Sequence, residues 1–104
     1  MKQGEIRRDL ATASPVSLHV LVLSGPRYLS AGKDRVVACR VVPGAVPDDF
    51  TSVHRVTYQS GGVDTIGLAV PDLIDWYPAS ALGEPVGFVT EMRPVIRLVE
   101  ALFR

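Results

Sequence analysis

The most apolar stretch of the chain is Ser17–Ser24, which reads SLHVLVLS and is followed at once by Gly25-Pro26. It is long enough to cross a small core as a β-strand, and proline ends it because proline has no amide hydrogen to donate to a ladder. A second stretch, Arg35–Val42, is rich in valine and stops in the same way at Pro43-Gly44. The two stretches predict two strands of a β-rich core.

Shorter segments surround these two strands. Those that predict strands are Ile6–Leu10, Val53–Gln59 and Asp64–Val70, with a hairpin turn at Ser60-Gly61-Gly62 between the last two. Leu73–Tyr77 predicts either a short final strand or one turn of helix, and Pro43–Thr51 predicts an exposed loop. Short apolar stretches divided by turn residues are typical of an all-β barrel or sandwich, here mostly antiparallel.

The C-terminus breaks this pattern with apolar residues at helical spacing. They recur at i, i+3, i+4, i+7, i+10 and i+11: Met92, Val95, Ile96, Val99, Leu102 and Phe103. The other side carries Arg93, Arg97, Glu100 and Arg104. This spacing predicts an amphipathic helix that starts either near Thr90-Glu91 or at Pro94, with its apolar side against the sheet or a partner.

Length and charge limit the class of protein. The chain has 104 residues, 47% hydrophobic and 21% charged, which is typical of one globular domain, residues 1–104. The net charge is zero, but Met1–Arg55 carries eight Lys or Arg against five acidic residues, whereas Val56–Met92 carries five acidic residues and neither Lys nor Arg. This balance argues against a protein that coats DNA without selectivity. Two interpretations stay open: a basic face that contacts a few phosphates, or mixed faces that keep a small domain soluble.

Cysteine content and the first residues indicate the compartment. Cys39 is the only cysteine, so no intrachain disulfide can form and no cysteine cluster can hold zinc. Met1–Leu10 is charged where a signal peptide needs an apolar stretch, and no apolar run approaches about 18 residues. We therefore expect a cytoplasmic protein with no membrane partner.

Signatures of common catalytic sites are missing from the sequence. It contains no phosphate-binding Gly-x-x-x-x-Gly-Lys, no Gly-x-Ser-x-Gly and no His-Glu-x-x-His, and its two histidines lie 35 residues apart. The sequence thus predicts neither a metal site nor a cofactor.

Several polar and aromatic residues allow two interpretations each. His19, inside an apolar strand, fits either a hydrogen-bonded core residue or a catalyst. His54-Arg55 fits either a solvated face or a functional contact, and Arg40 must reach solvent or find an acceptor because an isolated buried charge is costly. Trp76-Tyr77 fits either a stacking platform for a nucleobase or a core or dimer interface.

Six segments follow one another in a specific order: Met1–Leu10, Val20–Ser24, Arg35–Val42, Asp64–Val70, Leu73–Asp75 and Ala81–Gly87. In their order and spacing they resemble the MazF/PemK-like toxin family of bacterial type II toxin-antitoxin pairs. The resemblance spans nearly the whole chain. It includes a Gly-acid-apolar start leading to an Asp-Leu, and a Leu-Gly-x-x-x-Gly before the terminal helix.

The resemblance implies a fold and an activity. The fold would be an SH3-like small antiparallel β-barrel of the CcdB/MazF/PemK type with a C-terminal α-helix, and the working unit a homodimer. The activity would be growth inhibition by metal-independent, sequence-selective cleavage of single-stranded RNA, with no cofactor. An antitoxin would restrain it by laying a disordered tail in the substrate groove. Attack of a 2′-OH on the neighbouring phosphate needs a base, an acid and fixed donors for the growing charge.

The resemblance also leads to candidate site residues. The family commonly has Arg-Pro before the second strand and Thr or Ser at the end of the third, where this chain has Leu18-His19 and Val42. We expect His19 to act as acid or base, and Arg40, which shares a side of its strand with Val42, to stabilise charge. Four further residues are expected to bind RNA: Arg27, Lys33, His54 and Arg55.

Two other functions remain as alternatives. In the first, the fold is a catalytically silent module that binds an antitoxin or another protein. In the second, the chain poisons a DNA topoisomerase, as CcdB-type proteins do, through the region of Arg93, Arg97 and Phe103 in the terminal helix.

Overall fold

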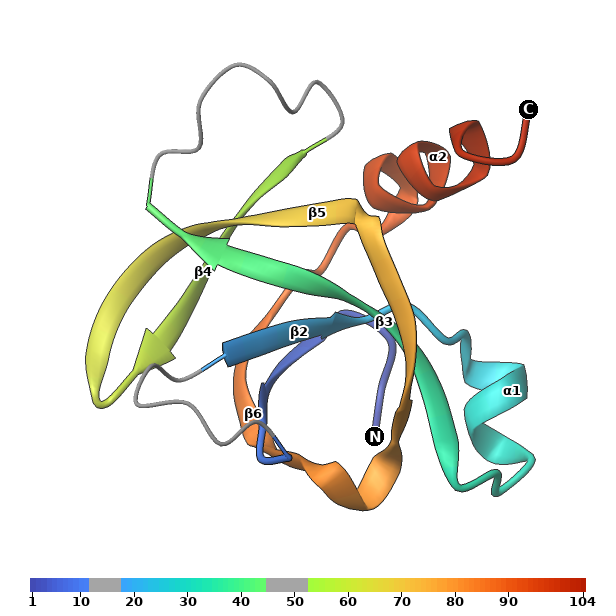
Figure 1. The fold of residues 1–104 in the computed structure, drawn as a ribbon, viewed down its shortest axis with the longest axis horizontal. Helices are drawn as coiled ribbons and strands as arrows, with labels where there is room; N and C mark the ends of the chain where they lie inside the picture. The colour runs from blue at the N-terminus through green and yellow to red at the C-terminus, as the bar shows by residue number, and fades with distance from the viewer. Residues whose placement is uncertain (12–17, 45–52) are drawn as a thin grey trace.

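The computed structural model describes residues 1–11, 18–44 and 53–104, and these ranges are mainly β-sheet (Figure 1). The strands are β1 (Glu5–Asp9), β2 (Leu18–Val22), β3 (Arg35–Pro43), β4 (His54–Ser60), β5 (Val63–Pro78) and β6 (Leu82–Phe88). They form one sheet in the order β4-β5-β3-β2-β1-β6, in which every neighbouring pair is antiparallel. The helical elements are α1 (Pro26–Ser30), a 3₁₀ turn η1 (Ala79–Ala81) and α2 (Arg93–Ala101). The expected antiparallel β fold with a C-terminal helix is confirmed, and it is consistent with a small β-barrel.

The sheet curls into a half-barrel, and β5 bends in its middle. Cys39 of β3 pairs with Ile74 of β5. The next residue of β3, Arg40, pairs with Val70, so Pro71–Leu73 bulge out of the ladder. A bulge bends its strand and increases the local twist. Figure 1 shows β5 running along one side of the sheet and then turning sharply towards η1.

The two edge strands, β4 and β6, come close to each other where the half-barrel closes. A β-carbon at Gly87 of β6 would lie 2.8 Å from the carbonyl oxygen of Thr57 and 2.8 Å from Cβ of Tyr58. Real side chains do not tolerate such distances, so this approach of β6 to β4 requires glycine at position 87.

Apolar side chains fill both faces of the curled sheet because alternate residues of its strands are apolar. The larger cluster joins one face to α2 and is built from Ile6, Leu21, Leu23, Cys39, Val41, Val56, Tyr58, Ala69, Met92 and Val95. The smaller cluster lies on the other face and contains Val20, Val36, Ala38 and Leu82, with Leu29 and Tyr77 packed against it.

The C-terminal helix is amphipathic, as its spacing predicts. It begins at Arg93 with Pro94 in the first turn, and Val95 is fully buried against the sheet. The helix ends at Ala101, so Phe103 lies beyond it and is 77% exposed, although it falls on the apolar stripe. Neither α1 nor α2 in the described chain has the length and hydrophobicity needed to cross a membrane.

The structure differs from the sequence-based expectation in three places. Asp64–Val70 and Leu73–Tyr77 are parts of the single strand β5, because the bulge keeps both halves paired with β3. Leu82–Phe88, expected as a segment leading to the helix, is the strand β6 paired with β1. Pro26–Ser30, after β2, forms the short helix α1. Ser17 and most of the expected loop Pro43–Thr51 lie outside the described residues.

Candidate functional site

His19 lies near the start of β2, on the face of the sheet that carries the larger apolar cluster. Its ring centroid is 4.8 Å from that of Tyr58, with the planes tilted by 47°, and the residue is only 4% exposed. Burial, and to a lesser degree the positive charge of Arg8, lower the pKa of His19 below 6.5. The imidazole is therefore neutral at pH 7 and able to accept a proton.

Strand register places Arg8 and His54 on the same face as His19. Arg8 pairs with His19, which in turn pairs with Val41. Val41 pairs with Ala69, and Ala69 pairs with His54. Residues directly opposite each other in antiparallel strands share a face. Arg8 is thus the immediate neighbour of His19, whereas β3 and β5 lie between the two histidines.

Arg40 lies on the opposite face of the sheet from His19. It pairs with Val20, the residue next to His19, and successive residues of a strand point to opposite faces. Arg40 does share a face with Val42, as expected. Contrary to the expectation that His19 and Arg40 serve one phosphate, the pleat prevents them from facing a common site within one chain.

Arg40 forms an ion pair on that opposite face, and this explains why a charged residue occurs in an apolar strand. Its Nη1 is 3.6 Å from Oδ2 of Asp9, and its Cζ is 6.0 Å from the centroid of the Tyr77 ring. Nη1 is buried, and it forms no hydrogen bond with the described residues. The Asp9 side chain is 7% exposed, and that of Arg40 is 26% exposed. Arg40 therefore neutralises a buried carboxylate between β3 and β1.

The four residues expected to bind RNA are not brought together. His54 is half-buried on the His19 face, and Arg55, the next residue, is exposed on the other face. Arg27 is exposed on α1. Lys33 is exposed in the turn before β3, where it lines a pocket of about 370 Å³ that also contains Trp76.

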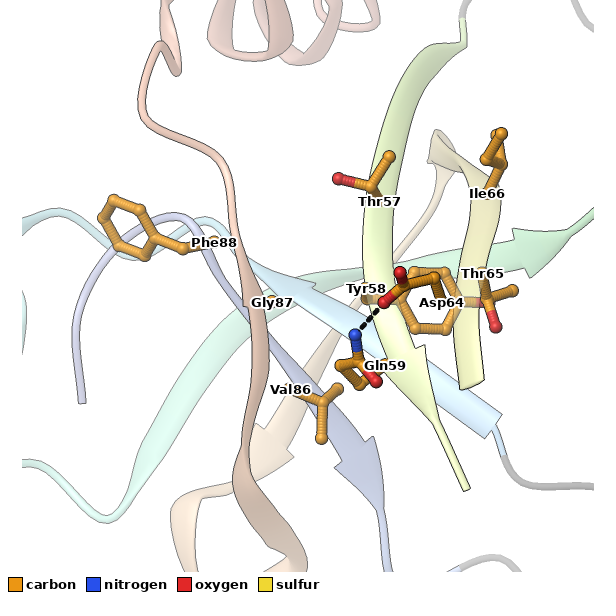
Figure 2. Close-up of a pocket in the computed structure, with 9 residues that line it drawn as sticks. All are labelled: Thr57, Tyr58, Gln59, Asp64, Thr65, Ile66, Val86, Gly87 and Phe88. Atoms are coloured by element: carbon orange, nitrogen blue, oxygen red, sulfur yellow. Dashed lines mark hydrogen bonds between the residues drawn. The ribbon is translucent and has the colours of Figure 1, made fainter. Parts of the chain in front are cut away.

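A groove of about 590 Å³ lies between the β4–β5 hairpin and β6 (Figure 2). It is lined by Thr57, Tyr58, Gln59, Asp64, Thr65, Ile66, Val86, Gly87 and Phe88. The Gln59 amide donates a hydrogen bond to the Asp64 carboxylate, which is the only charged group among the described residues of the lining. A groove with hydroxyl, amide and apolar groups but no cation is suited to a polypeptide rather than to a phosphate backbone.

The described residues offer no metal site of the usual kind, since they contain no cluster of three His, Cys, Asp or Glu side chains. Burial raises the pKa of Cys39 to about 12, while hydrogen bonds to backbone groups oppose the rise. Cys39 is therefore a protonated core residue at neutral pH and not a nucleophile.

Sequence reasoning missed Arg8 and Tyr58 beside His19, and Tyr28 and Arg35 beside Trp76. Arg8 carries a usable signal, because β1 and β2 are consecutive antiparallel strands and a charged residue facing His19 follows from their register. Tyr58 and Tyr28 carry none, because their ring contacts join segments far apart in the chain.

Comparison with known proteins gives two findings. The family model described as "Type II toxin-antitoxin system toxin Rv0299" matches residues 4–102. The chain is also similar to Toxin Rv0299 of Mycobacterium tuberculosis (strain ATCC 25618 / H37Rv), with 34% identity over 98 residues that cover 92% of this chain and 89% of that protein. The expectation of a type II toxin is confirmed by these matches, which are to the Rv0299 family.

Proposed function

This chain belongs to the Rv0299 family of type II toxin-antitoxin system toxins, and from that premise we propose that it cleaves single-stranded RNA sequence-selectively without a metal ion. Membership of such a family implies a cognate antitoxin as partner. The observation that carries the proposal is the pairing of Arg8 with His19, whose imidazole is held neutral.

The chemistry assigned to this pair follows from charge. The neutral imidazole of His19 takes the proton from a ribose 2′-OH as the new 2′-O–P bond forms. The guanidinium of Arg8 stabilises the negative charge that grows on the phosphoryl oxygens. The bond from phosphorus to the 5′-oxygen breaks, water protonates that oxygen, and a 2′,3′-cyclic phosphate remains. The hydroxide that water leaves takes the proton from the His19 imidazolium, which restores the neutral base.

This proposal gives Arg8 the role first expected of Arg40. Arg8 is exposed and faces His19, whereas Arg40 is on the other face and paired with Asp9. Because His19 is only 4% exposed, RNA must uncover an edge of the imidazole when it binds at Arg8.

The proposed working unit is a homodimer. Large apolar side chains remain exposed on the single chain, among them Val63 at 66%, Ile66 at 57% and Phe88 at 51%. Burying them against a second copy would remove this apolar surface from water. Light scattering on the eluting protein gives the mass that checks this, with a mass of one chain as the contrary result.

The decisive experiment incubates a long RNA with the purified chain in EDTA and maps the cut ends. We expect discrete cuts with 2′,3′-cyclic phosphate ends. His19→Gln and Arg8→Ala should each slow cleavage, the first by about a hundredfold or more, while Arg97→Ala on the exposed side of α2 serves as the matched control. Wild-type rates in both site variants contradict the assignment.

The pH profile of cleavage adds an independent check. A base with a lowered pKa keeps its reactive form at lower pH, so the acid limb of kcat/KM should have its midpoint below 6.5. A midpoint above 6.5, or an acid limb unchanged in His19→Gln, rules out His19 as the base.

A second candidate function is a catalytically silent module that binds a protein, and the groove of Figure 2 favours it. The groove lies between the two edge strands, where backbone groups of β4 and β6 are able to pair with an added extended segment. Intact RNA without growth inhibition supports this function. Intact RNA with growth inhibition points instead to a topoisomerase poison that uses the exposed Phe103.

A further inference from the structure

Two aromatic side chains and two cations meet at a surface whose pocket lining does not include His19. The ring centroids of Tyr28, on α1, and Trp76, near the end of β5, are 5.9 Å apart with the planes tilted by 55°. The pocket of about 370 Å³ beside them is lined by Tyr28, Lys33, Asp34, Arg35 and Trp76. Figure 1 shows α1 beside the first part of β3, which pairs with the end of β5 that holds Trp76.

Strand pairing explains why this surface exists. Arg35, the first residue of β3, pairs with Pro78, and Val37 pairs with Trp76. The bend of β5 carries Trp76 away from the first half of that strand and towards the turn that holds Lys33. The surface therefore rests on paired backbone on its β3 and β5 side, so its aromatic and charged groups have a stable spacing.

Exposure and charge distinguish this surface from ordinary core packing. Trp76 is 52% exposed, although a tryptophan that only stabilised the fold would be largely covered. Lys33 and Arg35 are exposed, and among the described residues neither forms an ion pair. Asp34 opposes part of their positive charge, which leaves one net positive charge in the lining.

We propose that this pocket binds one nucleotide of a single-stranded RNA. The base stacks on the indole of Trp76, and the adjoining phosphate is bound by Lys33 and Arg35. Stacking on an aromatic ring next to a cationic track is the general way in which proteins hold single strands, because every base has a π-face. The choice of RNA as ligand rests on the proposed function of the chain. The pocket is a binding site and takes no part in bond breaking.

Charge favours RNA over a proline-rich peptide as the ligand. A proline-rich peptide also packs on exposed Trp and Tyr rings, but it brings no negative charge to satisfy Lys33 and Arg35. A phosphate group does so directly.

The single tryptophan of the chain makes the test specific. Trp76 is the only tryptophan, so tryptophan fluorescence, excited where the three tyrosines do not absorb, reports on this pocket alone. The probe is a 2′-O-methyl octanucleotide of mixed sequence, which lacks the free 2′-OH and therefore cannot be cleaved. Titrating it into the intact chain should quench the fluorescence, with the same Kd that fluorescence anisotropy gives for the labelled octanucleotide.

Variants separate the contributions of stacking and charge. Trp76→Ala should weaken binding, followed by anisotropy, about tenfold or more, and Trp76→Phe should recover part of it. Lys33→Ala and Arg35→Ala should each lower the slope of log affinity against log salt by about 0.7. The matched controls are Phe103→Ala, an exposed aromatic residue beyond the end of α2 and outside the pocket, and Arg97→Ala, an exposed cation on α2.

Several results would overturn the proposal. One is octanucleotide binding without quenching, or binding that Trp76→Ala leaves unchanged. Another is quenching by a proline-rich decapeptide with none by the octanucleotide, which would identify the surface as a protein contact. Because the probe is uncleavable, binding at Trp76 by a chain that cuts no RNA refutes the ribonuclease function alone. Cleavage by a chain whose Trp76 does not respond refutes the pocket alone.

Discussion

Two ring pairs of similar geometry, His19–Tyr58 and Tyr28–Trp76, differ in what surrounds them. Their centroids are 4.8 Å and 5.9 Å apart, and their planes are tilted by 47° and 55°. The first pair is covered by the larger apolar cluster, whereas Trp76 in the second is 52% exposed beside Lys33 and Arg35. Burial changes the acid-base chemistry of a ring, while exposure next to cations makes a ring available to a ligand. The same type of contact therefore serves two different purposes.

The largest expected effect is the difference in the free energy of unfolding when one ring is removed from each pair. Tyr58→Ala deletes a buried aromatic side chain and leaves a cavity, so we expect a loss of about 3–5 kcal/mol in the free energy of unfolding. Trp76→Ala, at an exposed position, should cost less than about 1 kcal/mol. Urea unfolding of both variants measures this. Equal losses would mean that the Trp76 surface is part of the core.

The ion pair on the opposite face should give an intermediate effect. Asp9→Asn removes the negative charge that faces Arg40 and leaves the buried Nη1 without its counter-charge. We expect a loss of about 2 kcal/mol, less than for a fully buried pair because the Arg40 side chain is 26% exposed. Chemical unfolding provides the measurement, and cleavage by the folded variant should stay close to wild type. A variant that is folded and stable but does not cleave RNA would show that the Asp9–Arg40 pair is needed for catalysis.

The contribution of buried His19 to the stability of the folded chain should depend on pH. Folding lowers the pKa of His19 below 6.5, so the unfolded chain binds the proton more readily than the folded chain. The contribution to stability is complete above pH 6.5 and is lost as the pH falls through 6.5 towards the folded pKa. We expect the unfolding midpoint to fall as the pH is lowered through 6.5, and to fall more steeply for the wild type than for His19→Asn. Parallel curves would show that His19 is not the group responsible.

The smallest effect is expected at an exposed ion pair that belongs to neither ring pair. Glu100 and Arg104 are 3.6 Å apart in the i,i+4 relation, with side chains 56% and 80% exposed. Such pairs contribute little because water screens them, so Arg104→Ala should change the unfolding free energy by less than about 0.5 kcal/mol. This variant gives the background against which the other changes are judged, and a larger loss would indicate that the end of α2 has a further contact.

Several elements of the fold follow from local patterns. The strands β2 and β3 are visible because apolar runs end at Pro26 and Pro43, and α2 is visible because its apolar residues repeat every three or four positions. The strand β6 was not recognised because LGEPVGF contains two glycines and a proline, which normally argue against a strand. Gly87 is there because β4 approaches closely, and no local signal records that approach.

For the candidate site too, residue types could be selected from the sequence, but their contacts could not. Sequence reasoning selected His19 and Lys33 and considered Trp76 as a stacking residue, because residue type alone reveals their chemistry. It placed His19 and Arg40 together, although strand register puts them on opposite faces. It also left Lys33 and Trp76 separate, although the bend of β5 brings them to one pocket.

The sequence by itself determined the positions of β1 to β4, the position of the amphipathic helix and the residues that carry acid-base or stacking chemistry, because these depend on neighbours a few positions away. Only the tertiary structure decided which of those residues meet. The bulge at Pro71–Leu73, the register of β1, β2 and β3, and the packing of β6 on β4 are set by contacts between distant segments. Such contacts are chosen by the burial of the whole core, which no short stretch of sequence contains.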